Sequence, residues 1–178
     1  MQSYHKRDVT CIDVNQKNYL VTGSIDNMIC FWNSYDCKIN KQVQMPEELA
    51  PISQGNSICT VKFADPRSNE HLLVFMNYGQ VYLLDTVSEK YIAQKTGEYE
   101  LCQLKKFSTV EVKDGLCLSV SEKGEGFLHR IEARTKTFKT THNTTADKVT
   151  VSMEQLYSFK LQDKVSLSLP FTFVFTAT

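Results

Sequence analysis

The sequence has no excess of charge of either sign and no long hydrophobic run. It contains 20 basic and 20 acidic residues among 178, so no global field favours nucleic acid or an anionic membrane as a partner. No stretch approaches the roughly 18 consecutive apolar residues of a spanning helix, and residues 1–10 (MQSYHKRDVT) lack the apolar core of a signal peptide. The sequence therefore favours a cytoplasmic protein that binds neither nucleic acid nor a membrane.

Pairs of cysteines and clusters of metal ligands are also missing. No CxxC pair occurs, and no nearby histidine lies at zinc-ligand spacing. The pattern favours reduced thiols that act as small hydrophobic residues over disulfides or a metal site. The acidic residues show no ligand cluster either, so we expect no metal and no cofactor. The six isolated cysteines are Cys11, Cys30, Cys37, Cys59, Cys102 and Cys117.

One segment, residues 21–33 (VTGSIDNMICFWN), carries more information than the rest of the chain. Two runs rich in β-branched and aromatic side chains flank Asp26 and Asn27, residue types that favour tight turns. Both runs are apolar on both faces, which is typical of strands covered on two sides. With one strand before them and one after, they predict a blade of four antiparallel strands. The four expected strands are Val9–Val14, Tyr19–Ser24, Met28–Asn33 and residues 38–45.

These residues resemble the repeat of the WD-repeat β-propellers, which opens with a histidine and closes with Trp-Asp. The pair Trp32 and Asn33 stands in for Trp-Asp here, and Tyr4 replaces the glycine that usually precedes the histidine. The resemblance implies that four residues of this repeat form the hydrogen-bonded tetrad of the family. The four are His5, Thr22, Asp26 and Trp32.

A structural role explains this tetrad better than a catalytic one. A buried indole N–H needs an acceptor, which we expect Thr22 to supply, with His5 bridging Thr22 to the carboxylate of Asp26. The alternative is a hydrolase in which Thr22 is the nucleophile, His5 its base and Asp26 the orienting group. Against it, the nucleophile lies inside an expected strand, with no glycine-rich elbow to expose it and no evident oxyanion donor. We therefore expect no catalytic residue.

A second, degenerate repeat is expected at residues 58–95. Three β-prone runs follow one another there, and Gly79 marks the turn between the second and the third. Compared with the first repeat, at residues 5–45, apolar packing replaces the hydrogen bonds, and this joint replacement leaves no unpaired donor behind. The residues aligned with Thr22, Asp26 and Trp32 are Val74, Tyr78 and Leu84.

The pattern weakens along the rest of the chain. Residues 101–141 keep only the spacing of strand-like runs and turns that a third repeat would have. Residues 1–145 are therefore expected to hold the propeller blades. We assign residues 146–178 to an incomplete fourth blade or to a tail that is not native sequence. Residues 165–178 contain Pro170 and a charge-free, β-prone run with the signature of an aggregation-prone segment.

The sequence thus predicts an all-β protein, a partial β-propeller of about three four-stranded antiparallel blades plus a fourth-blade remnant. Because a propeller closes as a ring of roughly four to eight blades, we expect a fragment of a larger WD-repeat protein. The resemblance implies a non-catalytic protein–protein interaction scaffold, whose partners are other proteins and the remaining blades. The arrangement of one strong repeat beside degenerate ones is similar to that of the large WD-repeat proteins of cilia and flagella and of other cytoskeletal scaffolds. This similarity suggests a cilium or the cytoskeleton as the location of the protein.

Four loops are expected on the exposed surface of such a scaffold. They comprise residues 4–8, 46–56, 65–71 and 97–100. The second and the third are favoured for partner contact, because long ordered loops on a rigid scaffold usually carry recognition. Within the third loop, Arg67 and His71 are candidates to contact acidic groups of a partner.

Overall fold

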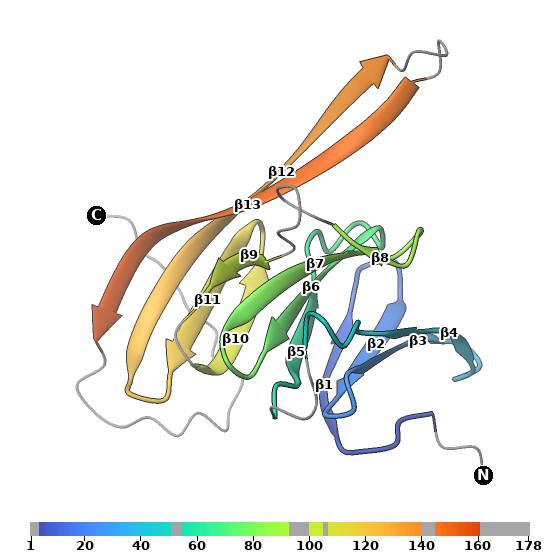
Figure 1. Cartoon of the computed structure of the whole chain (residues 1–178), viewed down its shortest axis with the longest axis horizontal. Helices are drawn as coiled ribbons and strands as arrows, with labels where there is room; N and C mark the ends of the chain where they lie inside the picture. The colour runs from blue at the N-terminus through green and yellow to red at the C-terminus, as the bar shows by residue number, and fades with distance from the viewer. Residues whose placement is uncertain (1–3, 51–54, 93–99, 105–106, 140–144, 161–178) are drawn as a thin grey trace.

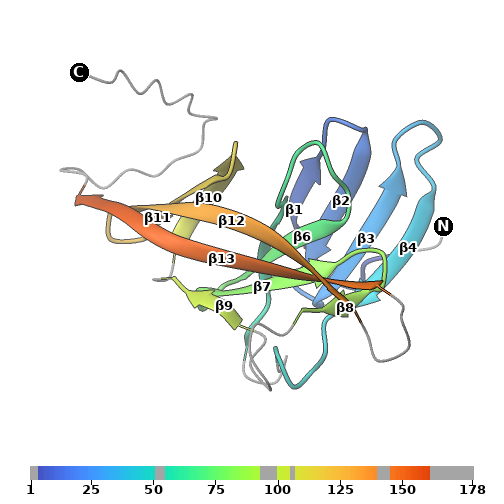
Figure 2. The ribbon, with the colours of Figure 1, turned by 90° about the horizontal axis from the view of Figure 1, so that it is seen from above.

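The computed structural model describes residues 4–50, 55–92, 100–104, 107–139 and 145–160. Within these ranges the chain forms thirteen β-strands and no helix. The strands make three antiparallel sheets that follow one another along the chain and lie side by side (Figures 1 and 2). The all-β class expected from the sequence is confirmed.

The first sheet is a simple meander in the order β1-β2-β3-β4. Its β2–β3 turn forms because Asn27 adopts a left-handed conformation, with φ of 61°, and Asn is among the few residues that tolerate it. Asp26 supports the turn by accepting a hydrogen bond from the N–H of Met28 at 3.0 Å. The strands are β1 (Val9–Val14), β2 (Tyr19–Ser24), β3 (Met28–Asn33) and β4 (Ile39–Gln44).

The second sheet repeats this meander and adds a fifth strand. Its strands are β5 (Ile58–Phe63), β6 (His71–Met76), β7 (Gln80–Asp85), β8 (Lys90–Tyr91) and β9 (Glu100–Gln103). The short β8 pairs only with Leu84 and Asp85, so β9 pairs with the first half of β7 and satisfies its backbone groups. Residues 100–103 therefore belong to the second sheet, whereas the sequence placed the start of the third repeat there.

A glycine permits this close approach of β9. Gly79 has a φ of +95°, and a Cβ at this position would lie 2.1 Å from the carbonyl oxygen of Leu104. The N–H of Leu104 in turn donates to the carbonyl of Gly79 at 2.8 Å. Gly79 thus serves both the β6–β7 turn and the docking of the segment that follows β9.

The third sheet ends in two strands that are much longer than the others. Its strands are β10 (Phe107–Lys113), β11 (Leu116–Ser121), β12 (Glu125–Lys139) and β13 (Thr145–Lys160). The pairing of β12 with β13 continues from Glu125 opposite Lys160 to Lys139 opposite Thr145. In Figure 1 the two strands leave the sheet as a ribbon that projects past its neighbours.

The ribbon corrects the expected boundary at residue 145. Residues 145–160 are the outer strand of the third sheet and not the start of a fourth blade. The physical reason is that β12 continues well beyond Arg130, its last residue to pair with β11. It therefore offers a full edge of backbone donors and acceptors, with which β13 pairs. The expected tail at residues 161–178 lies outside the described residues.

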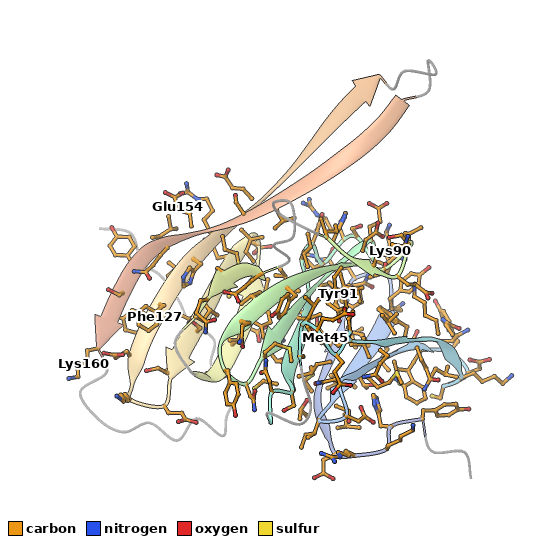
Figure 3. All side chains as sticks on the ribbon, in the orientation of Figure 1. Met45, Lys90, Tyr91, Phe127, Glu154 and Lys160 are labelled. Carbon is orange, nitrogen blue, oxygen red and sulfur yellow. The ribbon has the colours of Figure 1, made fainter. Side chains whose placement is uncertain are left out.

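Two apolar clusters hold the three sheets together. The second sheet contributes to both, and Leu72, Leu73, Val74, Phe75 and Met76 of β6 are all 0% exposed. Burial on two faces explains why this strand reads as a continuous apolar run. Figure 3 shows Met45 and Tyr91, two members of the first cluster, where the first and second sheets meet.

A charged contact also links the first strands of the three sheets, which lie next to one another. Lys62 Nζ of β5 lies 3.4 Å from Asp13 Oδ1 of β1 and 3.0 Å from Glu111 Oε2 of β10. Burial lowers the pKa of Lys62, but the two carboxylates outweigh it, so the pKa lies above its usual value. The side chain of Asp13 also accepts the N–H of Phe63 at 2.9 Å.

Candidate functional site

The first sheet brings the four expected tetrad residues together. Thr22 lies in the middle of β2 and Trp32 near the end of β3, while His5 precedes β1. The Oγ1 atom of Thr22 lies 2.8 Å from Nε1 of Trp32 and 2.8 Å from Nε2 of His5. The indole N–H donates to the hydroxyl oxygen, which leaves the hydroxyl hydrogen to be donated to the imidazole.

The tetrad continues from His5 to Asp26. His5 Nδ1 lies 3.7 Å from Asp26 Oδ1, and the two side chains are 7% and 11% exposed. Burial raises the pKa of Asp26, but the N–H groups of Lys6 and Met28, together with the Ser24 side chain, outweigh that effect, so the pKa lies below its usual value. The carboxylate is therefore held in its charged form by the turn that carries it.

The polar side-chain atoms of the tetrad contact one another. The hydroxyl of Thr22 already accepts the indole N–H, and Thr22 is 8% exposed. Tyr4 covers Trp32, with the two rings edge to face at 5.4 Å. Acyl transfer needs a hydroxyl that a substrate can reach and a donor for the oxyanion. The arrangement instead resembles a buried polar network that fixes strand positions.

A hollow of about 450 Å³ lies beside Asp26, at one end of the first sheet. This volume is within the range of about 300–1,000 Å³ found for ligand pockets. Three segments form it: the stretch before β1, the β2–β3 turn and the segment after β4. Its lining comprises Lys6, Arg7, Asp26, Met28, Gln44, Met45, Pro46, Glu47 and Ala50.

Asn27 holds these segments in place. Its side-chain amide donates to the carbonyls of Ala50 and Asn56, at 3.2 and 3.1 Å, and its side-chain oxygen accepts the N–H of Ile58 at 2.9 Å. Asn27 is 1% exposed. Gln44 closes the same corner by donating to the carbonyls of Asp26 and Asn27. The wall after β4 is therefore tied to the turn by side-chain hydrogen bonds.

The expected contact loops meet at this hollow only in part. Residues 4–8 and the described part of 46–56 contribute to it, whereas 65–71 does not, and most of 97–100 lies outside the described residues. Arg67 pairs with Asp65 at 3.3 Å within its own loop. His71 begins β6, opposite Asp85.

Sequence reasoning missed several residues of the hollow. Met28 and Gln44 read as ordinary strand residues, and Asn27 reads only as a turn former. Their common role arises because two turns and a connection converge, and no spacing in the sequence signals this convergence.

The described residues show no metal-binding cluster and no disulfide. No group of three or more His, Cys, Asp or Glu side chains there is placed to hold a metal ion. The six cysteines are free thiols. Burial raises the pKa of Cys117 to about 12 and that of Cys102 also to about 12, so both thiols stay protonated at neutral pH. The part of the chain that the structure describes contains no helix with the length and apolar character of a membrane span.

Comparisons with known proteins address the fold. A scan against protein-family models and a search of curated proteins each gave no match. Among solved structures, the chain is similar to the computationally designed Ika4 protein, with 10% sequence identity, a TM-score of 0.50, and 84% of this chain and 96% of that chain covered. It is also similar to a chain of a mitotic checkpoint complex, with 14% identity, a TM-score of 0.47, and 72% and 35% covered.

The fold is a partial β-propeller. Three successive antiparallel meanders stack face to face, and their first strands lie next to one another. We call the three sheets blades from here on. The chain spans 35% of the mitotic checkpoint chain that it matches, and at these identities the similarity concerns the fold alone.

Proposed function

We propose that this chain is a non-catalytic protein–protein interaction scaffold and a fragment of a larger WD-repeat protein. The observation that carries the proposal is the tetrad, in which His5, Thr22, Asp26 and Trp32 engage one another inside one blade. The WD-repeat resemblance of these residues and the meander topology support the same assignment. A rigid blade with an open hollow at its end suits recognition of another protein.

The first blade supports the view that further blades are among the partners. Its tetrad face corresponds in register to the face of the second blade that carries Val74 and Leu84, which packs against the first blade. On the first blade this face leaves Ile12 60% and Val14 51% exposed. Another blade placed there would cover them as the first blade covers its neighbour.

The proposed location is the cytoplasm, in a cilium or on the cytoskeleton. The support for this location is that one strong repeat beside degenerate repeats resembles the pattern in large WD-repeat proteins of cilia and the cytoskeleton. Imaging of a tagged full chain in ciliated cells tests this part, and a signal confined to another compartment would contradict it.

Stability measurements on tetrad variants test the scaffold role. Trp32→Ala and Asp26→Ala should each lower the free energy of unfolding by about 1–4 kcal/mol, because the first removes a half-buried aromatic ring and the second a member of the hydrogen-bond network. Partner binding should weaken only as a consequence of unfolding. Urea titration gives the stability, and binding of the same variants is measured under conditions where they remain folded.

A hydrolase that uses Thr22, His5 and Asp26 is the alternative that the 2.8 Å contact between Thr22 and His5 leaves to be tested. Thr22→Val would then abolish turnover of an ester or peptide substrate without changing the melting temperature. We expect no turnover by the wild-type chain and a lower melting temperature for the variant. Turnover that is lost in a fully folded Thr22→Val chain would overturn the scaffold proposal.

A further inference from the structure

Among the described residues, the outer strand of the third blade, β13, pairs along one edge only, with β12. Its last part runs from Glu154 to Lys160, both labelled in Figure 3, and carries two exposed aromatic rings. We propose that residues 165–178 of the same chain return as a further strand along the free edge of β13 and cover these rings. The inference concerns the third blade and does not depend on the scaffold function.

The two rings, those of Tyr157 and Phe159, lie on one face of β13, because side chains alternate along a strand. Their partners on β12 are Leu128 and Gly126. The ring of Phe159 lies over Gly126, where a Cβ would approach it to 2.2 Å. Tyr157 nevertheless remains 72% and Phe159 41% exposed, so this face still offers apolar surface to a further strand.

The first blade protects its outer edge in a different way. Its last strand, β4, is short, and the exposed residues Asn40, Gln42 and Gln44 are polar. Short strands with polar side chains discourage pairing with a further strand. The strand β13 is 16 residues long and places aromatic rings beside its edge. An edge of this kind needs a cover.

The residues that follow β13 have the sequence pattern of a half-buried strand. Residues 165–169 (VSLSL) and 171–175 (FTFVF) place apolar side chains at every second position, mostly with serine or threonine between them. This alternation is typical of a strand with one face against an apolar surface. Left exposed, such a charge-free segment is prone to aggregate. Pairing with β13 would cover the segment and the two rings together.

The length of the connection favours a return to β13 over the start of a new blade. Residues 161–165 lie within the range of about two to five residues that is common in hairpin loops. In contrast, the chain uses residues 45–57 to pass from β4 to β5, and residues 92–106, which include β9, to pass from β8 to β10. A hairpin is therefore the simpler continuation.

One register matches both faces of β13. It places Leu167 opposite Phe159 and Leu169 opposite Tyr157, so apolar side chains meet on the open face. A shift by one residue would exchange the two faces of the added strand. On the opposite face, where β13 carries exposed polar residues, the pairs are Ser166 with Lys160 and Ser168 with Ser158.

The proline of the segment also suits this register. Pro170 comes opposite Leu156, the residue of β13 that the pairing with β12 skips. Proline has no N–H to donate and is tolerated on edge strands and at irregular positions of a sheet. The same register therefore accounts for the apolar residues and for the proline.

Hydrogen–deuterium exchange of the full chain, measured by mass spectrometry, tests the proposed strand. Amides of residues 165–169 should exchange about tenfold or more slowly than those of a free peptide of the same sequence. Leu167→Asp/Leu169→Asp should remove this protection and speed exchange in residues 154–160, because the apolar contacts with the two rings are lost. Exchange in residues 19–33 of the first blade should not change, which checks that the variant remains folded.

A matched control adds the same charge on the other face of the segment. Ser166→Asp/Ser168→Asp should keep the protection of residues 165–169, since these side chains lie away from the rings. Equal losses in the two variants, or no protection in the wild type, would overturn the inference. Protection that disappears on dilution would identify a second copy as the occupant and would overturn it as well.

Disulfide trapping tests the register. Opposite residues of antiparallel strands have Cβ atoms about 4.5–5.5 Å apart, close to the spacing that a disulfide requires. With oxidised glutathione, Phe159→Cys/Leu167→Cys should form a link within one chain, whereas Phe159→Cys/Ser166→Cys should not, because its two thiols lie on opposite faces. Both chains also carry Cys37→Ser, because Cys37 is an exposed thiol. Peptide mapping that finds no link, equal links in the two chains, or a link between two molecules would contradict the proposed pairing.

Discussion

Asn27 combines a backbone role and a side-chain role at one position. Its left-handed conformation makes the β2–β3 turn, and its amide joins that turn to the segment after β4 and to the start of β5. A glycine would satisfy the backbone requirement alone. The geometry of the hollow therefore depends on the amide of Asn27 as well as on the turn.

A pair of glycine substitutions separates these two roles. Asn27→Gly keeps the left-handed backbone but removes three buried hydrogen bonds, so the free energy of unfolding should fall by about 1–3 kcal/mol. Asn18→Gly is the matched control, because Asn18 also has a positive φ, 60°, but is exposed. Urea titration of both variants gives the comparison. Equal losses for the two would show that the amide of Asn27 contributes nothing beyond the turn.

The sequence was informative about the tetrad residues because their types and spacing lie within one repeat. It named His5, Thr22, Asp26 and Trp32, and the structure places their polar atoms as described above. The hollow was not foreseen, because Met28, Gln44 and Glu47 have no shared spacing. Their meeting depends on the path that the chain takes after β4.

At the scale of elements, the strands of the first two blades could be predicted from the sequence, whereas the pairing at the outer edges of the sheets could not. Residues 19–24 and 28–33 have local patterns and a turn between them, so each strand has its partner next to it in the chain. The pairing of β9 with β7 and the full length of β13 depend on which edges remain unpaired in the folded blade. Such long-range choices leave no periodic signal in the sequence.

The interface between the second and third blades contains a buried titratable group, His129. His129 of β12 is 7% exposed, and its Nδ1 atom has no hydrogen-bond partner among the described residues. It lies opposite Cys117 of β11, which belongs to the apolar cluster of this interface. Burial lowers the pKa of His129 below its usual value, because the charged imidazolium would lose its water.

This burial predicts that mild acid weakens the fold. The folded chain favours neutral His129, so the stability that it contributes is complete above the ordinary pKa of about 6.5 and declines as the pH falls below that value toward the lowered pKa. The free energy of unfolding should therefore drop between about pH 7.5 and pH 5.5. His129→Leu should flatten this dependence, whereas His71→Gln should retain it. An unchanged slope in His129→Leu would contradict the prediction.

At the scale of the whole molecule, the stack of three blades leaves the tetrad face of the first one open. Val9, Ile12 and Val14 of β1 are each more than half exposed. On the last strand of the third blade, Tyr157 is 72% and Phe159 41% exposed. Apolar residues gathered on a sheet face are typical of a surface that meets another molecule or blade.

We therefore expect the isolated chain to self-associate through its outer blades, or to be unstable where it does not. Sedimentation velocity should show species that dissociate on dilution. Ile12→Lys/Val14→Lys should shift the distribution toward monomer, while Val87→Lys, at an exposed position of the β7–β8 turn, should leave it unchanged. A compact wild-type monomer that resists dilution and melts cooperatively would be evidence against this expectation.

The tetrad face also gives the chain its own optical probe. Trp32 is the only tryptophan of the 178 residues, and it lies half-buried on the open face of the first blade. The emission of an indole moves to shorter wavelength when water around it is displaced. The intrinsic fluorescence of the unlabelled protein would thus report when a neighbouring blade or a second copy seals that face, without a dye and without an added mutation.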